Sequence, residues 1–132
     1  MKLFGAFLLL AAFVTVAEGS DEYLKDWERM SAEHDRLIST PAGKDYEERL
    51  IAVHNMFWRD VYAQCIADAR KEGVAVFRAI AVIDSAGNVT QFLTMPNSTH
   101  FSCFTKSMVG KRYPKPPTVP FHERFRIYIT RD

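Results

Sequence analysis

The stretch "GVAVFRAIAVIDSAGNVTQFLT", residues 73–94, decides the fold, because its period differs from that of the residues before it. Alternate residues from Val76 to Val82 fall on one side of an extended chain, and the residues between them fall on the other. "DSAGN" then supplies a turn in which Gly87 can take the positive φ of a bulged hairpin. The sequence therefore predicts two antiparallel strands joined by this turn.

Two helices are predicted before the hairpin. Residues 20–43 are expected to form an amphipathic helix and a loop, because apolar and aromatic side chains recur there at helical spacing: Tyr23, Trp27, Met30, His34 and Leu37. "TPAG", residues 40–43, is expected to break this helix. A longer helix is predicted from Asp45, which resembles a capping box with Glu48, to a stop at Gly73.

Three further segments follow the hairpin. "THFSCFTKSMV", residues 99–109, is predicted to be a short helix, and the proline-rich residues 111–120 are predicted to be extended. "FHERFRIYI", residues 121–129, alternates again and is predicted to be the last strand. The predicted fold class is α+β, in which helices pack on a small, mainly antiparallel three-stranded sheet, with an extra N-terminal helix.

Residues 1–19 have the pattern of a signal peptide. Lys2 precedes an apolar run from Leu3 to Val16, and Ala17-Glu18-Gly19 fits the small residues of a cleavage site. This run is short for a membrane span, so we expect cleavage, and an uncleaved anchor is the alternative. The expected location is the periplasm or the outside of the cell, with no stable membrane span after cleavage.

The charge balance argues against a nucleic-acid partner. The chain of 132 residues has 17 Lys and Arg residues against 16 Asp and Glu residues, so it has no large net charge to attract a polyanion. We therefore expect no binding of nucleic acid.

Cys65 and Cys103 are the only cysteines, and export would place them in an oxidising compartment, where two cysteines usually pair. A nucleophilic Cys65 lacks a base, because His54 lies about 16 Å away along the same predicted helix. The histidines lie on separate predicted elements, and His100 near Cys103 is better explained as a surface residue than as a metal ligand. We therefore predict a disulfide, no catalytic residue, no metal site and no cofactor.

The order of elements and several motifs resemble the C-terminal domains of the TonB and TolA group. Its hairpin is similar to "EGVAVFRAIAVIDSAGNV", and its later helix, proline element and last strand are similar to "HFSCFTKSMVGKRYPKPP" and "FHERFRIYI". Cys65 and Cys103 stand where a gliding-motility branch carries two cysteines. The resemblance implies a TonB/TolA-like domain over residues 44–132, as a free-standing exported copy. The family's Trp-Arg is replaced by Lys111-Arg112 and Tyr113, so no partner-binding role is carried over.

The function predicted from this resemblance and from the last strand is non-enzymatic protein binding, as an adaptor for an envelope or secreted protein. Residues 121–129 are expected at a sheet edge, where an extended peptide can add as a further strand. The candidate partner-binding residues are Arg124, Arg126, Tyr128 and Tyr113.

Two alternatives remain open at this stage. The chain fits the size of a small secreted inhibitor or immunity-type protein that blocks an exported enzyme or toxin. Dimerisation through Tyr23, Trp27 and Met30 is a further alternative, although packing of this stripe on the chain's own core is favoured.

Overall fold

The computed structural model describes residues 18–131, and these contain a three-stranded antiparallel sheet in the order β2-β1-β3. The strands are β1 (Val76–Ile83), β2 (Val89–Met95) and β3 (Phe121–Tyr128). The burial of β1 alternates only from Val76 to Ala79, because Ile80 and Val82 on its other face are covered by the helix residues Trp27 and Met30, and a register shift marks a bulge at its end, between Val82 and Ile83. The hairpin and the last strand are therefore confirmed, and β3 lies at an edge of the sheet, as predicted.

Gly87 positions the proline-rich segment against the hairpin turn. Its φ is 90°, and a Cβ atom there would lie 2.1 Å from the carbonyl oxygen of Tyr113. The amide of Tyr113 donates to the carbonyl oxygen of Gly87 at 2.8 Å. Glycine is needed at this position both for the backbone conformation and for the close approach of the crossing chain.

The helices are α1 (Glu18–Ile38), α2 (Pro41–Arg70), the 3-10 turn η1 (Thr99–Phe101) and α3 (Ser102–Met108). The predicted start of the second helix at Asp45 is wrong. Thr40 is the N-cap, because its Oγ1 accepts from the amide of Gly43 at 3.0 Å, and Pro41 occupies the first turn, where its missing N–H costs nothing. The first helix begins at Glu18, and the predicted signal peptide lies almost entirely outside the described residues.

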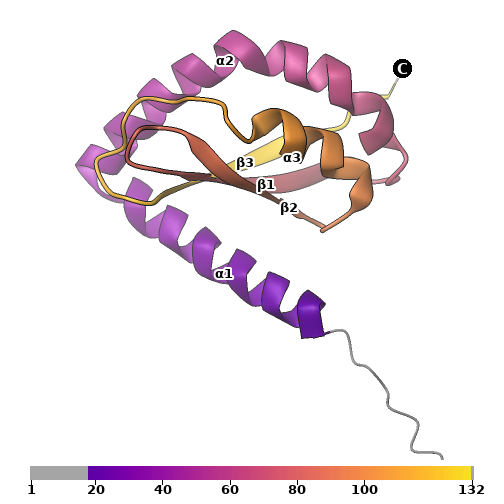
Figure 1. The fold of residues 1–132 in the computed structure, drawn as a ribbon, viewed down its shortest axis with the longest axis horizontal. Coiled ribbons are helices and arrows are strands. Elements are labelled where there is room, and N and C mark those ends of the chain that lie inside the picture. The colour runs from indigo at the N-terminus through magenta and orange to yellow at the C-terminus, as the bar shows by residue number, and fades with distance from the viewer. Residues whose placement is uncertain (1–17, 132) are drawn as a thin grey trace, which may run out of the picture.

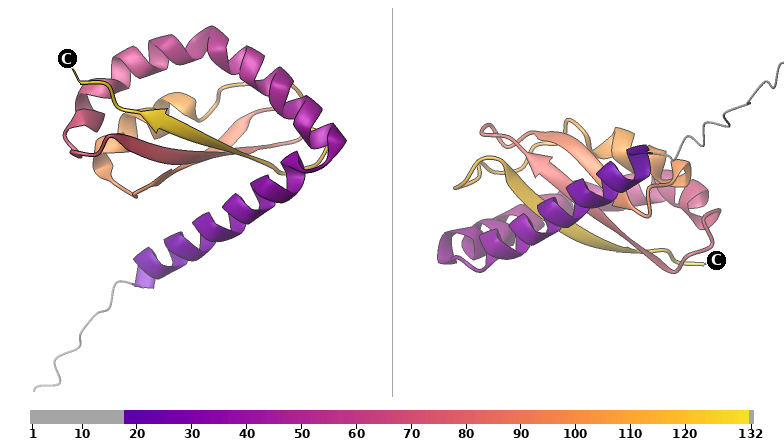
Figure 2. Two further views of the ribbon diagram at one scale, coloured as in Figure 1. Left: turned by 180° about the vertical axis from the view of Figure 1, so that it is seen from behind. Right: turned by 90° about the horizontal axis from the view of Figure 1, so that it is seen from below.

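Helices cover both faces of the sheet, as Figures 1 and 2 show. On one face α2 and α3 close over a large core that includes Tyr46, Leu50 and Phe77. On the other face α1 lies across the sheet, where Trp27 and Met30 pack on Ile80 and Val82 of β1. The apolar stripe of the first helix is thus buried within its own chain, at 4% exposure for Trp27 and 7% for Met30.

The structure confirms an α+β fold with three helices on a three-stranded antiparallel sheet. The specific TonB/TolA-like arrangement stays a prediction. Among the helices of residues 18–131, none is long and apolar enough to cross a membrane.

Candidate functional site

The outer edge of β3 is the surface on which the predicted function depends. In an antiparallel pair, alternate residues direct both backbone polar groups toward the neighbouring strand. The amide of Ile129 donates to the carbonyl oxygen of Ala75, just before β1, at 2.9 Å. The backbone polar groups of the odd-numbered residues of β3 therefore point toward β1. The backbone groups of His122, Arg124, Arg126 and Tyr128 therefore point away from the sheet.

Both ends of this edge are occupied by helix side chains. From α1, Nδ1 of His34 lies 2.9 Å from the carbonyl oxygen of His122 and 3.3 Å from the amide nitrogen of Arg124. From α2, the hydroxyl of Tyr62 donates to the carbonyl oxygen of Tyr128 at 2.8 Å and accepts from the amide of Thr130 at 3.0 Å. These side chains take the positions that a neighbouring strand would otherwise fill.

The middle of the edge is open. Within residues 18–131, the carbonyl oxygen of Arg124, both backbone groups of Arg126 and the amide of Tyr128 have no hydrogen-bonding partner on the outer side. These groups form a short row that a single extended segment can reach. We call this row the open edge.

An apolar groove of about 470 Å³ lies beside the open edge, between α2 and β3. Trp58 and Tyr62 of α2 are half-buried there, and Tyr128 of β3 is 63% exposed. The other lining residues are mainly polar or cationic: Asn55, Arg59, Arg126, Ile127 and Thr130. Exposed aromatic surface next to unpaired backbone is typical of a binding site.

A second cleft, of about 480 Å³, lies where the same strand meets both α1 and α2. Arg78, Arg124 and Arg126 line it together with Glu47 and Glu123, and Arg78 stands directly opposite Arg126 across the strands. The side chains of Arg78 and Arg126 are exposed. The open edge therefore has an apolar groove on its α2 side and the exposed side chains of Arg78 and Arg126 on the opposite face of the sheet.

The four predicted partner-binding residues do not share one surface. Arg126 and Tyr128 lie at the open edge. Arg124 is half-buried and binds α1, with one guanidinium nitrogen 2.6 Å from Ser31 Oγ and the other 2.9 Å from Asp35 Oδ1. Tyr113 is 3% exposed, so its ring lies in the core and is not presented to a partner.

Tyr113 belongs instead to a buried aromatic group around His54. Its hydroxyl and Nδ1 of His54 share a hydrogen bond at 2.8 Å, and the His54 ring stacks on Trp58 and Phe125. Burial lowers the pKa of His54 to about 4, because a charged imidazole would lose its hydration there. This histidine is neutral at physiological pH and serves the packing of α2 on β3.

Cys65 and Cys103 form the predicted disulfide. It joins α2 to α3 across a Cα–Cα distance of 5.3 Å, and no free cysteine is found. Cys65 is fully buried. Both sulfur atoms are taken up by this bond, which joins the two helices that cover one face of the sheet.

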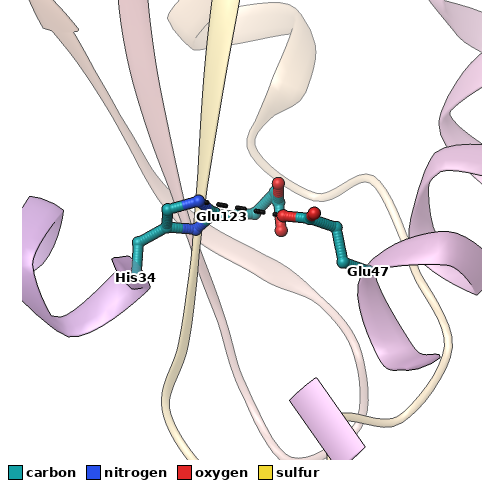
Figure 3. A group of neighbouring side chains, drawn as sticks. All are labelled: His34, Glu47 and Glu123. Atoms are coloured by element: carbon teal, nitrogen blue, oxygen red, sulfur yellow. Dashed lines mark ion pairs between the residues drawn. The ribbon is translucent and has the colours of Figure 1, made fainter. Parts of the chain in front are cut away.

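A buried polar cluster at the α1–α2 junction was missed by the sequence analysis. His34 of α1, Glu47 of α2 and Glu123 of β3 bring their polar atoms together, as Figure 3 shows. Burial, with Glu47 close by, raises the pKa of Glu123 to about 10. The signal that could have revealed it was a carboxylate at position 123 on the face predicted to be apolar, between Phe121 and Phe125.

No protein-family model matches this chain, and no curated protein or solved structure is significantly similar to it. The function proposed below therefore rests on the residues and the geometry described above.

Proposed function

We propose that this protein is a non-enzymatic binding domain that takes up an extended segment of a partner protein by strand addition at the open edge of β3. The observation that supports the proposal most is the row of unpaired backbone groups from Arg124 to Tyr128, bounded by the His34 and Tyr62 side chains. Backbone hydrogen bonds of an added strand supply affinity, and pockets beside it select side chains.

The two sides of the edge indicate the chemistry of that segment. Successive side chains of an added strand point to opposite faces of the sheet. One set would enter the apolar groove beside Trp58 and Tyr62, and the other would lie on the opposite face of the sheet, beside Arg78 and Arg126. The proposed ligand is therefore a short segment in which aromatic or aliphatic residues alternate with acidic ones.

The predicted export places this partner among envelope or secreted proteins. A structural disulfide suits an oxidising compartment of that kind. The bounded edge suits an adaptor, because His34 and Tyr62 limit how far a strand can pair and so disfavour open-ended association of sheets.

The proposal can be tested with a synthetic hexapeptide that alternates phenylalanine and aspartate, added to isotope-labelled protein and followed by NMR. We expect amide shifts centred on residues 122–130. A second peptide of the same composition, with its phenylalanines and aspartates in two blocks, should bind more weakly. A third, N-methylated at the pairing amides, should fail to bind, because strand addition requires those donors.

Variants of the protein provide the matched controls. Arg126→Glu should weaken binding of the alternating peptide about fivefold, which corresponds to about 1 kcal/mol for one exposed charge contact. Lys44→Glu makes a similar charge change at an exposed position at the start of α2, and it should leave affinity unchanged. Binding that survives N-methylation, or shifts that cluster away from residues 122–130, would show that strand addition is not the mechanism.

A further inference from the structure

Three potential metal ligands meet where α1, α2 and β3 come together. One ligand atom from each of His34, Glu47 and Glu123 lies within 4.8 Å of the other two. Nε2 of His34 lies 3.8 Å from Oε2 of Glu47, and the Glu123 carboxylate lies beside both (Figure 3). His34 and Glu47 lie on consecutive helices and Glu123 lies on the last strand, so the packing of these elements creates the group.

Among the described residues, Glu47 has an ion-pair partner in His34, whereas Glu123 has none. Glu123 is 3% exposed, and its Oε2 has no hydrogen-bonding partner in the described structure. The nearest arginine in the sequence, Arg124, directs its guanidinium to Ser31 and Asp35 instead. Burying one carboxylate next to a second is costly, so the arrangement is stable only with a proton or a metal cation between them.

The orientation of His34 indicates what that species is. Nδ1 lies 2.9 Å from the carbonyl oxygen of His122, and this contact is favourable when Nδ1 carries the proton of the neutral ring, in which case the longer 3.3 Å approach of the Arg124 amide to the same atom is not a hydrogen bond. Nε2 then has a lone pair, and it faces the carboxylates. A histidine held by a backbone carbonyl through its other nitrogen is the usual arrangement at a metal centre.

We propose that His34, Glu47 and Glu123 bind one divalent transition-metal ion, with Zn²⁺ as the best candidate. One imidazole and two carboxylates suit Zn²⁺ or Mn²⁺, whereas Mg²⁺ and Ca²⁺ favour sites built of oxygen alone. Ligand atoms about 2.0–2.2 Å from one ion lie roughly 3–4 Å from each other. The three ligand atoms here lie within 4.8 Å of one another, so a modest rotation of the glutamate side chains brings them into this range.

The site has access to solvent and room for a further ligand. Glu47 is 25% exposed, and all three residues line the second cleft beside β3. Three protein ligands leave one position of a tetrahedral ion free for water or an anion. An ion there would also tie α1 to α2 and β3, since each of these elements supplies one ligand. This inference does not depend on peptide binding at the open edge.

Calorimetry with zinc chloride tests the site, using purified protein freed of metal by a chelator. We expect one ion per chain, and a rise in thermal stability that grows with zinc concentration. Glu123→Gln and His34→Asn should each weaken zinc binding at least about tenfold, because each removes one of three ligands. Glu48→Gln, at the exposed neighbouring position on α2, and His100→Gln should bind zinc as the unaltered chain does.

A proton shared between the two carboxylates is the competing way to neutralise them. The same calorimetric experiment distinguishes a bound metal ion from a shared proton. If zinc does not bind, or if Glu123→Gln binds it as tightly as the unaltered chain, the proposal is overturned and a shared proton explains the cluster. Nitrogen NMR of the His34 imidazole gives a second readout that does not depend on folding of a variant. Zinc should shift Nε2 strongly while Nδ1 keeps its proton, and an unchanged Nε2 signal would contradict the proposal.

Discussion

The hydroxyl of Tyr23 occupies both outward backbone groups of Thr94, for it donates to the carbonyl oxygen at 2.6 Å and accepts from the amide at 2.8 Å. Tyr23 belongs to α1, and Thr94 lies on β2, the edge opposite β3. Tyr62 makes a similar pair of contacts at the end of β3. The protein thus limits both edges of its sheet with tyrosine hydroxyls from the helices, which protects it from uncontrolled strand pairing.

Tyr23→Phe should expose the edge of β2 at Thr94. The change keeps the ring and removes only the hydroxyl, so the expected loss of unfolding free energy is about 1 kcal/mol. Amide hydrogen exchange of Thr94 should become faster, and this is measured by NMR at constant pH. Tyr128→Phe is the matched control, because Tyr128 is exposed and its hydroxyl has no partner among the described residues. Unchanged protection of Thr94 would contradict the role assigned to Tyr23.

Loss of the disulfide should destabilise the protein strongly. Cys65 and Cys103 are 38 positions apart, and closing a loop of this length stabilises the folded state by about 4 kcal/mol in the chain-entropy model. Urea unfolding of the double variant Cys65→Ala/Cys103→Ala should therefore show a much lower midpoint than that of the oxidised chain. Adding a reductant should lower the midpoint of the natural chain and leave that of the double variant unchanged. Equal midpoints for both oxidised proteins would show that the bond contributes little.

The sequence predicted the structure best where a periodic pattern of side chains lay next to a turn residue. Alternation on either side of a glycine turn predicted the hairpin, and the last strand followed from the same period. The boundary between the first two helices was misplaced, because "TPAG" was interpreted only as a helix breaker. Threonine followed by proline is also a helix start, and the buried contact of Gly43 with α1 allows the chain to turn there within two residues.

The sites were harder to predict, because they depend on which elements meet. Glu123 is one residue in an apolar alternation, and nothing local indicates that Glu47 and His34 will lie next to it. Tyr113 was named as a candidate partner-binding residue, yet its ring is buried against His54. The position of β3 at the edge was predicted, whereas the side chains that close its ends come from residues 34 and 62, on other elements.

Acid should weaken the fold through His54. Its pKa is about 4 in the folded protein and near 6.5 when unfolded, so the unfolded chain binds more protons between these values. The contribution of His54 to the free energy of unfolding is therefore full above pH 6.5 and is lost as the pH drops toward 4. The expected loss between pH 6.5 and pH 5 is about 1.5 kcal/mol from this group. Urea unfolding at several pH values measures it.

The control for this prediction removes the titrating ring while keeping the packing. The double variant His54→Phe/Tyr113→Phe should lose much of the acid dependence of stability that the single variant Tyr113→Phe shows. The comparison isolates the His54 imidazole, because both variants lack the Tyr113 hydroxyl. His100→Gln removes a half-exposed histidine and should keep the full dependence. The assignment to His54 fails if the double variant and Tyr113→Phe have the same slope against pH.

Gly43→Ala should disrupt the junction between α1 and α2. A Cβ atom at this position would lie 1.8 Å from the carbonyl oxygen of Leu37, which is backbone and cannot rotate away. The two helices must separate, and we expect a loss of about 3 kcal/mol in urea unfolding. Gly73→Ala is the control. The φ of 75° at this position strains alanine, but no atom lies within 4 Å of the added Cβ. This variant should therefore lose only about 1 kcal/mol of unfolding free energy.

The same variant links the junction to the proposed metal site. His34 lies before this turn and Glu47 after it, so separating the helices moves two ligands apart while leaving all three side chains intact. Gly43→Ala should therefore weaken zinc binding, measured by calorimetry under conditions in which circular dichroism shows the chain to be folded. Gly73→Ala lies at the far end of α2 and should bind zinc normally. If Gly43→Ala is destabilised and yet binds zinc with unchanged affinity, the ion is not held between α1 and α2.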